Sequence, residues 1–369
     1  MADPIVRFLD LETLHRPIRT ELEAAAARVV DRGLFVLGPE VSSFEDRWAR
    51  TSEAAFAIGV GNGFDALVLS LEGLGVRAGD HVLVPSNTYI ATWLAISAVG
   101  ATPVPVEPDP LTHVITPEAA EARIDTATKA ILPVHLYGRP VDVEGFEELA
   151  SRHGLVLVFD AAQAHGSTFG GRAVGGRGHA TAWSFYPTKN LGALGDGGAV
   201  TTNDAALAER IRRLRNYGSD RRNSVPSRGR NSRLDELQAA FLNVKLDHLE
   251  RWVTRRREIA GRYLAGLTGL ELDLPSRDSL EANSWHLFVV RARDRDRLRS
   301  RLLESGIETD VHYPIPPHRQ PAYADVAVGF GQLPVADRLA GEVMSLPLNA
   351  ALDDRDVERI VSGVRIAAG

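Results

Sequence analysis

The sequence predicts an α/β fold in which a large domain with a mostly parallel central sheet precedes a smaller C-terminal α/β domain. From residue 55 to residue 202, apolar segments of strand length alternate with segments that carry apolar residues at helical spacing. This alternation is typical of a parallel sheet with helices on both faces. Residues 154–159 form an apolar run, as in strands buried on both faces. The length of 369 residues allows two domains, and we expect them to span residues 1–245 and 246–369.

The elements expected in the first half begin with two helices. Apolar residues recur at helical spacing over residues 18–32, and the Gly33 that follows is a common helix stop. A second amphipathic helix is expected over residues 41–51. The alternating part then comprises strands over residues 55–60, 80–85, 102–106 and 129–136, with helices over 64–74 and 90–99 and another that begins at Thr116-Pro117.

The second half is expected to add strands that end near residues 187 and 202, followed by a helix over residues 204–214. Residues 212–233 then contain eight arginines against the single acid Asp220, and from residue 215 they lack helical periodicity. A loop this basic in an acidic protein favours contact with a phosphate-bearing ligand. The remaining expected elements are a long bridging helix over 234–257, a helix to 267, a strand over 285–290, and helices over 295–305 and 354–367.

Composition and charge limit the classes of function. The net charge of −6 argues against a general nucleic-acid binder, and the absence of cysteine excludes disulfides and thiolate metal sites. The eleven histidines show no spacing typical of metal ligands, so we expect no metal. No apolar run approaches the length of a membrane span, and residues 1–7 do not resemble a signal peptide. We therefore expect a cytoplasmic protein that binds neither membranes nor nucleic acid.

One lysine follows the apolar segment at residues 183–187. Lys189 stands just past this expected strand, and a glycine-rich turn and a further apolar strand come after it. A lysine held between buried strands is poorly solvated, which lowers its pKa and makes its amine a usable nucleophile. The alternative interpretation is an ordinary surface lysine at the end of a strand.

A carboxylate upstream of Lys189 in the sequence favours the interpretation of this lysine as a nucleophile. Asp160 follows the apolar run at residues 154–159, and α/β sheets bind ligands at the carboxyl ends of their strands. A pyridoxal 5'-phosphate (PLP) site requires an aspartate that keeps the pyridine nitrogen protonated and a lysine that binds the aldehyde. The sequence therefore predicts that Asp160 and Lys189 are the catalytic residues of a PLP enzyme.

Other residues are expected around the same cofactor. Gly63 and Phe64 begin a helix after a flexible turn, so their backbone N–H groups can bind the phosphate. The hydroxyl of Ser184 suits the same phosphate. Tyr89 follows a strand end and can stack on the ring, although a half-buried core tyrosine would show the same pattern. Gln163 is expected near the phenolic oxygen of the ring.

Seven motifs along the chain support a family resemblance. They are Gly61-Asn-Gly-Phe-Asp-Ala-Leu67, Val84-Pro-Ser-Asn-Thr-Tyr-Ile-Ala-Thr92, Pro133-Val-His-Leu-Tyr-Gly138, Asp160-Ala-Ala-Gln-Ala-His-Gly166, Ser184-Phe-Tyr-Pro-Thr-Lys-Asn190, Asn231-Ser-Arg-Leu-Asp-Glu-Leu-Gln-Ala-Ala240 and His312-Tyr-Pro314. With them the chain resembles the DegT/DnrJ/EryC1/StrS sugar aminotransferases, which are fold-type I PLP enzymes with an aspartate aminotransferase-like fold. It departs from the family at Phe64, where many members have a small polar residue.

The resemblance implies further roles. It implies a homodimer with shared active sites, in which Asn231 reaches the phosphate of the partner subunit's cofactor. His312 and Tyr313 are implied to contact the substrate, and Tyr186 is close enough to Lys189 in the sequence to touch the sugar or its diphosphate. Family members that dehydrate their substrate have histidine at the position of Lys189, so the lysine favours amino transfer.

The closer resemblance is to enzymes that aminate C3 of dTDP-linked 3-keto-6-deoxyhexoses, as in the desosamine and mycaminose pathways. The implied reaction moves an amino group from L-glutamate to this carbon during the biosynthesis of antibiotic deoxyaminosugars. Two alternatives are a C4 aminotransferase that acts on a dTDP-4-keto-6-deoxyhexose, and a non-catalytic regulatory protein of the same fold. The intact set of candidate residues favours an enzyme over the regulator.

Overall fold

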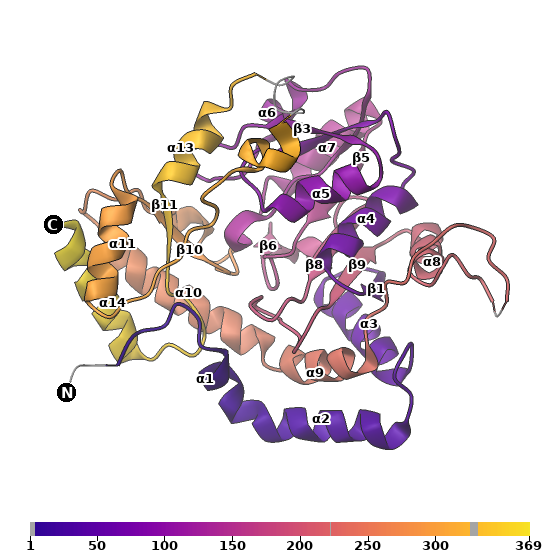
Figure 1. Ribbon diagram of the computed structural model, residues 1–369, viewed down its shortest axis with the longest axis horizontal. Coiled ribbons are helices and arrows are strands. Elements are labelled where there is room, and N and C mark those ends of the chain that lie inside the picture. Colours follow the sequence, from indigo (N-terminus) through magenta and orange to yellow (C-terminus); the bar gives the residue numbers. More distant parts are fainter. Residues whose placement is uncertain (1–3, 222, 325–330) are drawn as a thin grey trace.

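A computed structural model describes residues 4–221, 223–324 and 331–369. At its centre lies a seven-stranded sheet in the order β1-β9-β8-β5-β4-β2-β3 (Figure 1). Within this described sheet, β9 runs antiparallel to both of its neighbours and the other strands share one direction. The expected α/β fold with a mostly parallel sheet is confirmed. The strands are β1 (Phe56–Val60), β2 (His81–Pro85), β3 (Thr102–Val106), β4 (Thr128–Ile131), β5 (Val156–Asp160), β8 (Ala180–Ser184) and β9 (Gly198–Thr202).

Both faces of this sheet are covered, because successive side chains of a strand point to opposite faces. In β8, Ala182 packs in the core cluster that contains residues of α4, whereas Trp183 packs against Trp48 of α3, in a different cluster that also contains Phe44. This explains the absence of alternation in the sequence of these strands. The helices of this part are α1 (Leu11–His15), α2 (Arg19–Arg32), α3 (Pro39–Thr51), α4 (Gly63–Gly73), α5 (Ile90–Ala98), α6 (Pro117–Glu121), α7 (Val143–His153) and α8 (Ala205–Leu214).

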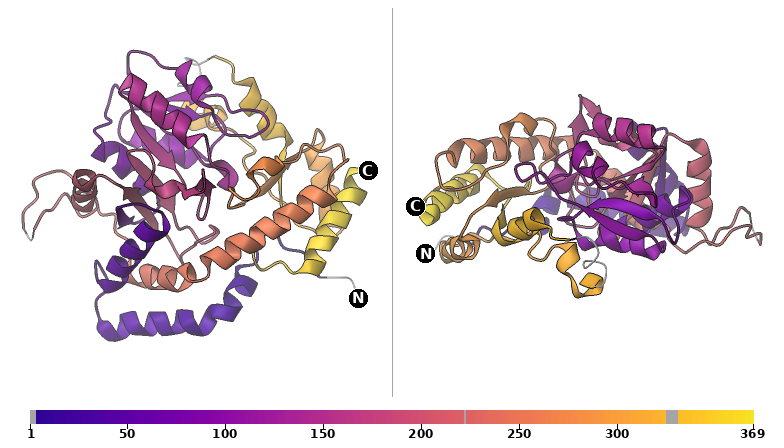
Figure 2. Two further views of the ribbon diagram at one scale, coloured as in Figure 1. Left: turned by 180° about the vertical axis from the view of Figure 1, so that it is seen from behind. Right: turned by 90° about the horizontal axis from the view of Figure 1, so that it is seen from above.

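The C-terminal elements surround a second core. Figure 2 shows the long helix α10 reaching from the region of the main sheet to these elements. Their core is lined by apolar residues such as Tyr263 of α10 and Phe288 of β10, and it also includes Val6 near the start of the chain. The elements are α10 (Leu249–Gly266), the antiparallel pair β10 (Phe288–Arg291) and β11 (Val343–Leu346), α11 (Arg295–Glu304), α13 (Pro334–Glu342) and α14 (Asp354–Ala368).

The expected single helix over residues 234–257 is wrong. The chain forms α9 (Glu236–Leu246) and then α10, with Asp247 and His248 between them. The backbone N–H groups of these two residues bond to carbonyls three residues back, so the last turn of α9 is tighter than an α-helix and changes the direction of the chain. α10 continues to Gly266, past the expected break at residue 257.

Other boundaries also differ from the expectation. β4 ends at Ile131 rather than at residue 136, shortly before Pro133, which cannot donate to a neighbouring strand. β10 begins at Phe288 because Trp285 has a positive φ of 49° that interrupts an extended chain. The sequence reading did not predict α7, α13, β11 or the small hairpin of β6 (Thr168–Phe169) and β7 (Arg172–Ala173).

Glu236 joins the start of α9 to the start of α3. Its buried carboxylate accepts hydrogen bonds from the backbone N–H groups of Gly38, Glu40 and Val41 at 2.8, 3.0 and 2.9 Å. The N-cap residue Gly38 has no side chain to satisfy these groups itself. A residue about 200 positions later in the chain therefore caps α3, since an anion is favourable at a helix N-terminus.

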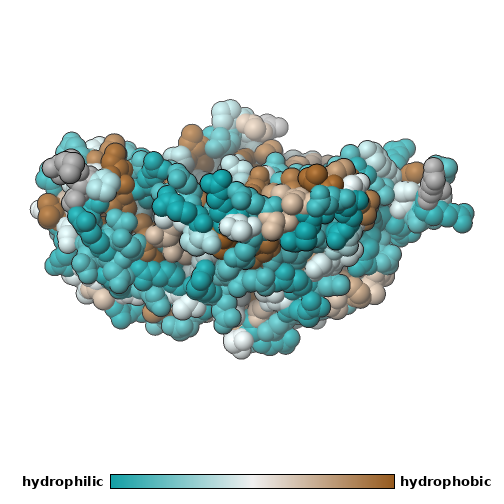
Figure 3. All heavy atoms as spheres, turned by 90° about the horizontal axis from the view of Figure 1, so that it is seen from below, coloured by the Kyte–Doolittle hydropathy of each residue, from teal (hydrophilic) through white to brown (hydrophobic). Residues whose placement is uncertain are grey.

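The surface carries apolar patches. The face in Figure 3 is mostly hydrophilic with separate hydrophobic areas. Residues 34–37, between α2 and α3, form an exposed apolar run in which the exposed fraction of Phe35 is 56%. Among the described helices, none combines the length and apolar content needed to cross a membrane.

Candidate active site

The carboxyl ends of β5 and β8 meet the start of α4 at one edge of the sheet. β5 and β8 pair in parallel, with Asp160 opposite Ala182. Ser184, at the end of β8, lies against Gly63 at the start of α4. This edge brings together the strand ends and the helix start from which the sequence predicted a cofactor site.

Asp160 is the last residue of β5 and is buried. One carboxylate oxygen accepts a hydrogen bond from the backbone N–H of Ala162 at 3.0 Å, and the other accepts one from the hydroxyl of Thr92 at 3.0 Å. Burial raises the pKa of Asp160, while these two hydrogen bonds and the charge of Lys189 lower it. The carboxylate is thus fixed in orientation and poorly solvated, as pairing with a cationic ring nitrogen requires.

Lys189 lies in the loop after β8 and is half-buried. β8 ends at Ser184, earlier than the expected end at residue 187, because the chain turns so that the Lys189 N–H bonds to the carbonyl of Tyr186. Burial lowers the pKa of Lys189 from 10.5 to about 8, and the negative charge of Asp160 acts in the opposite direction. The amine is therefore partly neutral near pH 7, which agrees with the predicted nucleophile.

The start of α4 forms a narrow cradle. A Cβ added to Gly63 would lie 2.5 Å from the Cβ of Ser184, and one added to Gly198 would lie 2.3 Å from the carbonyl oxygen of Asn62. The Asn62 side chain caps α4 by accepting from the N–H of Asp65 at 2.8 Å. These close approaches require glycine and leave the first N–H groups of α4 beside the Ser184 hydroxyl, an arrangement that suits an anion.

Gln163 links the strand end to the C-terminal part of the chain. Its carbonyl oxygen accepts from the N–H of Tyr137 at 2.6 Å, and its amide nitrogen donates to the hydroxyl of Tyr313 at 2.9 Å. The ring of Tyr313 lies 5.3 Å from that of Tyr89, centroid to centroid. Three of the side chains predicted to contact cofactor or substrate, Gln163, Tyr313 and Tyr89, therefore form one connected group.

His312 joins this group through Tyr137. The Tyr137 hydroxyl donates to the carbonyl oxygen of His312 at 2.5 Å, and Nδ1 of His312 lies 2.8 Å from the Ser345 hydroxyl. Burial lowers the pKa of His312, Asp310 raises it, and Lys189 lowers it further. His312 is therefore close enough to Lys189 to sense its charge.

Two buried residues that the sequence analysis did not select hold the lysine loop. Asn190, next to Lys189, donates to the carbonyl oxygen of Ser284 at 2.9 Å, and its own oxygen lies 3.4 Å from Nδ1 of His286. Burial and the nearby Lys189 lower the pKa of His286 far below 6.5, so the imidazole is neutral. A further buried histidine, His165, packs against Trp48 and the neighbouring aromatic rings.

Asn231 lies apart from the buried group. It is exposed and pairs with Asn216 across a β-bridge at the base of the arginine-rich loop. The next residue, Ser232, accepts from the N–H of Gly61 at 3.0 Å and donates to the carboxylate of Asp65 at 2.6 Å. The base of the loop is therefore attached to the turn before α4.

Much of the charge in the arginine-rich loop is used within the chain. Arg215 is buried and bonds to Glu45 and to the carbonyl oxygen of Gly59. Arg230 pairs with Glu72 at 2.8 Å. These arginines hold the loop on α3, β1 and α4, so their charges are used within the chain, and contact of the loop with a phosphate-bearing ligand stays a prediction. Of the eight arginines, residue 222 lies outside the described residues.

Two aromatic candidates are open to solvent. Tyr89 and Tyr186 have exposed fractions of 54% and 52%, so the half-buried core tyrosine considered for Tyr89 is wrong. Phe64 is half-buried and packs against the main core, which leaves its backbone N–H as its polar contribution. Within the described residues, no group of three or more His, Asp or Glu side chains is arranged to hold a metal ion.

Comparison with known proteins identifies the family. The family model described as "DegT/DnrJ/EryC1/StrS aminotransferase family" matches residues 17–365. The chain belongs to this family. Its members are PLP-dependent sugar aminotransferases, and the chain is an enzyme of this type.

Individual members of the DegT/DnrJ/EryC1/StrS family match nearly the whole chain. A dTDP-3-amino-3,4,6-trideoxy-alpha-D-glucose transaminase of Streptomyces venezuelae is 51% identical over 363 residues, which are 98% of this chain and 96% of that protein. The erythromycin biosynthesis sensory transduction protein EryC1 of Saccharopolyspora erythraea is 49% identical over 364 residues, covering 98% and 100%. The crystal structure of S. venezuelae DesV in complex with a ketimine intermediate has a TM-score of 0.97 at 50% identity, with 99% of both chains covered.

Proposed function

We propose that the protein is a PLP-dependent aminotransferase that moves an amino group from L-glutamate to C3 of a dTDP-3-keto-6-deoxyhexose. The observation that carries this proposal is the placement of Asp160 at the end of β5 and of Lys189 in the loop that follows the neighbouring parallel strand β8. The choice of substrate is supported by the 51% identity to a protein named as a dTDP-3-amino-sugar transaminase. The reaction belongs to deoxyaminosugar biosynthesis of the kind found in antibiotic pathways.

The residues present fit PLP. The N–H groups of Gly63 and Phe64, with the Ser184 hydroxyl, would hold the phosphate, because the space at Gly63 admits no Cβ. Asp160 would pair with the ring nitrogen, and the exposed ring of Tyr89 would cover the ring face. When bound, PLP supplies an electron-accepting ring that stabilises negative charge at the substrate carbon.

The chain's own groups then carry out binding and proton transfer. Lys189 has a lowered pKa, so its amine can hold and release a proton at the reacting carbon. Gln163 holds Tyr313, and Tyr137 holds the backbone at His312, so both substrate candidates are fixed before the sugar arrives. We propose that Gln163 also contacts the phenolic oxygen of the ring, and that Tyr186 contacts the sugar or its diphosphate.

We further propose a homodimer in which Asn231 reaches the partner subunit's phosphate site. Asn231 is exposed at a fixed position beside the turn before α4. The exposed apolar run at residues 34–37 and the exposed ring of Tyr186 are surfaces that a second copy would cover. The boundary of the two domains near residue 245 is a related proposal, supported by the break between α9 and α10 and by the separate C-terminal core. A cytoplasmic location remains a prediction from the sequence.

A mixing experiment tests the shared site. Inactive Lys189→Ala and Asn231→Ala chains are combined, and hybrid dimers then contain one site with both residues intact. Random exchange should restore about a quarter of the wild-type activity, since half of the dimers are hybrids with one working site each. Each variant alone provides the baseline. An active enzyme that sediments strictly as a monomer would refute the dimer.

Product analysis tests the position of amination. The enzyme is incubated with L-glutamate and either the 3-keto or the 4-keto dTDP-6-deoxyhexose, and the products are identified by NMR. We expect amination of the 3-keto sugar. Substitution of His312 or Tyr313 should slow the sugar half-reaction and leave the glutamate half-reaction unchanged. A 4-amino product without turnover of the 3-keto isomer would favour the C4 alternative.

A regulatory protein is the second candidate function, since EryC1 is named as a sensory transduction protein. The half-buried Lys189 beside the buried Asp160 favours catalysis, because a scaffold gains nothing from the cost of burying both charges. Borohydride reduction separates the two cases. Reduction should fix PLP covalently to wild-type protein and not to Lys189→Ala, whereas a scaffold without cofactor would incorporate none in either.

A further inference from the structure

A cavity separate from the candidate active site lies beside it. It has a volume of about 390 Å³ and is bounded by residues 110–113, by the turn at residues 137–139 and by residues 268–291 of the C-terminal part. It shares Tyr137 with the active-site group, but Asp160, Gln163, Ser184 and Lys189 do not line it. Its volume is within the range of small-molecule sites.

The wall of this cavity is unusually strained. Three of its residues, His113, Tyr137 and Trp285, have left-handed φ angles of 63°, 62° and 49°. Side chains other than glycine rarely adopt this conformation, and such residues collect at functional sites when the surrounding structure fixes them. Three such residues around one cavity indicate that its wall has a functional role in addition to joining the two parts of the chain.

Hydrogen bonds fix each strained residue on both sides of its backbone. Every one of the three uses its N–H as a donor and its carbonyl oxygen as an acceptor. The partners are Asp109 and Asn87 for His113, Gln163 and Leu287 for Tyr137, and Asn283 and Arg256 for Trp285. The cavity is therefore rigid before a ligand enters, and a preorganised site loses less entropy on binding.

Arg139 supplies the charge of the cavity. Its guanidinium donates to the hydroxyl of Ser279 at 3.1 Å, and among the ion pairs of the described residues none involves Arg139. Burial lowers its pKa, and the charges of Asp109 and Asp278 raise it. The carboxylate of Asp109 forms hydrogen bonds within its own loop, since it accepts from the backbone N–H groups of residues 111 and 112. A half-buried guanidinium without an ion pair is suited to bind an acid group.

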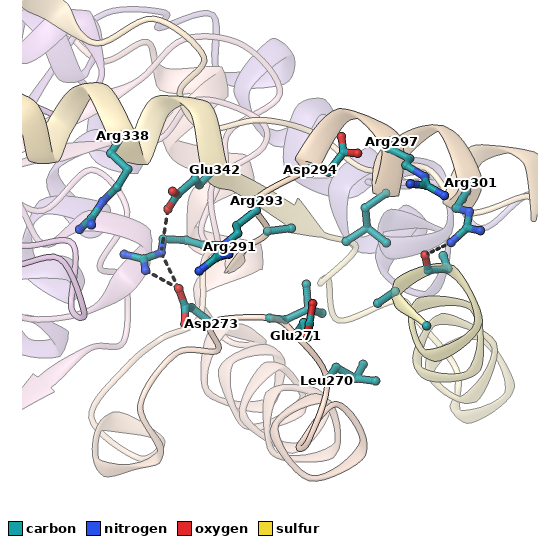
Figure 4. A pocket seen from close by; sticks show the side chains of 16 residues that line it. Leu270, Glu271, Asp273, Arg291, Arg293, Asp294, Arg297, Arg301, Arg338 and Glu342 are labelled. Carbon is teal, nitrogen blue, oxygen red and sulfur yellow. Dashed lines mark hydrogen bonds and ion pairs between the residues drawn. The ribbon is translucent and has the colours of Figure 1, made fainter.

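The other guanidinium of the cavity is neutralised. Arg291 bonds to Asp273 and to the carbonyl oxygen of Pro110, and it also pairs with Glu342 at 3.5 Å. Figure 4 shows the pairing of Arg291 with Asp273 and Glu342 from a neighbouring cavity of about 700 Å³, which Arg291 and Asp273 line as well. That neighbouring cavity is lined by five arginines and four acidic side chains, so most of its positive charges have a carboxylate nearby. Of the two arginines that line the cavity at Arg139, Arg291 is ion-paired with Asp273, whereas Arg139 appears in no ion pair of the described residues and lies beside an apolar wall.

The apolar wall consists of aromatic and aliphatic side chains. Trp285 and Leu287 are buried, and Leu272 and Leu274 are half-buried next to them. The ring of His113 packs edge-on against Tyr137 at 6.0 Å, and burial lowers its pKa to about 4, so it is uncharged at neutral pH. The wall therefore matches a flat or branched hydrocarbon group rather than a sugar.

We propose that this cavity binds a small organic anion, with its acid group on Arg139 and its apolar body against Trp285 and Leu287. This proposal does not depend on the reaction proposed above, because the cavity contains none of the groups predicted to hold PLP. A nucleotide sugar is a poor match, since its sugar and diphosphate are polar. The predicted ligand is an aromatic or aliphatic acid with a single negative charge.

The test uses the PLP-loaded enzyme and the dye anilinonaphthalene sulfonate, an aromatic anion that fluoresces in apolar surroundings. We expect about one tight dye site per chain. Phenylnaphthylamine has the same rings without the sulfonate and should bind at least about tenfold more weakly, because it cannot use the guanidinium. In Arg139→Met this difference between the two dyes should disappear, whereas Arg152→Met, a control on an exposed arginine, should retain it.

The comparison of two dyes on wild-type enzyme keeps the test valid even when Arg139→Met folds poorly. Equal affinity of both dyes for the wild-type enzyme would overturn the proposal. Wild-type dye binding by a folded Arg139→Met variant would also overturn it. Displacement of the dye by thymidine diphosphate or L-glutamate would place the dye in the active site and contradict a separate cavity.

Discussion

Replacement of Gly63 by alanine tests whether the start of α4 holds the phosphate of PLP. A Cβ at this position would lie 2.5 Å from the Cβ of Ser184 and 3.0 Å from its Cα and Oγ. The nearest of these contacts is shorter than Cβ atoms tolerate, and two of the three atoms cannot rotate away. Either the first turn of α4 or the end of β8 must therefore move, and both carry groups predicted to bind the phosphate.

The size of the effect follows from the overlap. Forcing one extra carbon into a packed site costs roughly 1–3 kcal/mol. If this cost falls on the phosphate cradle, the Kd for PLP rises about 5-fold to 150-fold, since about 1.4 kcal/mol corresponds to a factor of ten. Titration of the cofactor-free enzyme with PLP, followed by tryptophan fluorescence, measures this Kd. Thermal unfolding without PLP measures how much of the cost falls on the fold instead.

Two variants serve as controls for Gly63→Ala. Gly341 in α13 has nothing within 4 Å of an added Cβ, so Gly341→Ala should leave the Kd unchanged and stabilise the fold by up to about 1 kcal/mol. Ser184→Gly, added to Gly63→Ala, removes the clashing atom and should recover part of the affinity. A Gly63→Ala enzyme with wild-type affinity and wild-type unfolding would refute the cradle.

Three further predictions follow from the site and the fold. Because the pKa of Lys189 is lowered from 10.5 to about 8, the folded chain loses this proton before the unfolded chain does, and the stability of the cofactor-free enzyme should rise between these pH values. The rate of covalent PLP capture should increase about tenfold from pH 7 to pH 9 and then level off, whereas a continued rise to pH 10.5 would indicate an ordinary lysine. Asp160→Asn should slow the glutamate half-reaction, followed by stopped-flow absorbance, by roughly two to three orders of magnitude. Thr92→Val removes one hydrogen bond to Asp160 and should slow it by roughly fivefold. Equal rates in the wild-type protein and both variants would contradict the role assigned to Asp160. Glu236→Ala leaves three backbone N–H groups at the start of α3 without their acceptor, so urea unfolding should show a free energy of unfolding lower by at least about 3 kcal/mol. Glu250 is exposed, and the control Glu250→Ala should change this free energy by less than about 0.5 kcal/mol.

The parts of the site that the sequence predicted are those set by local pattern. A strand followed by an acid places Asp160, and a strand followed by a turn places Lys189, because parallel strands end at one edge of a sheet. The glycine turn before α4 is also local. In each case the residue type and the neighbouring strand or helix start were sufficient.

The parts that the sequence did not predict depend on distant contacts. Thr92 binds Asp160 from 68 positions away, and Asn190 reaches Ser284 across 94 positions. The left-handed conformation of Tyr137, which directs its N–H to Gln163, has no signal in a residue other than glycine. The acids that bind Arg215 and Arg230 lie on α3 and α4, so the sequence showed the positive charge of the loop without its partners.

The attachment of the arginine-rich loop has a consequence for engineering. Arg215 at one end and Ser232 at the other fasten its base to the structure around β1 and α4, and Figure 1 shows the rest of the loop extending away from the body of the chain. The outer part of such a loop can be replaced, because the contacts that attach the loop to the rest of the chain are made by its base. Segments exchanged between Tyr217 and Gly229, which leave Arg230 and Asn231 in place, could therefore alter what the subunit contacts at its edge, while the glycine turn before α4 keeps its geometry.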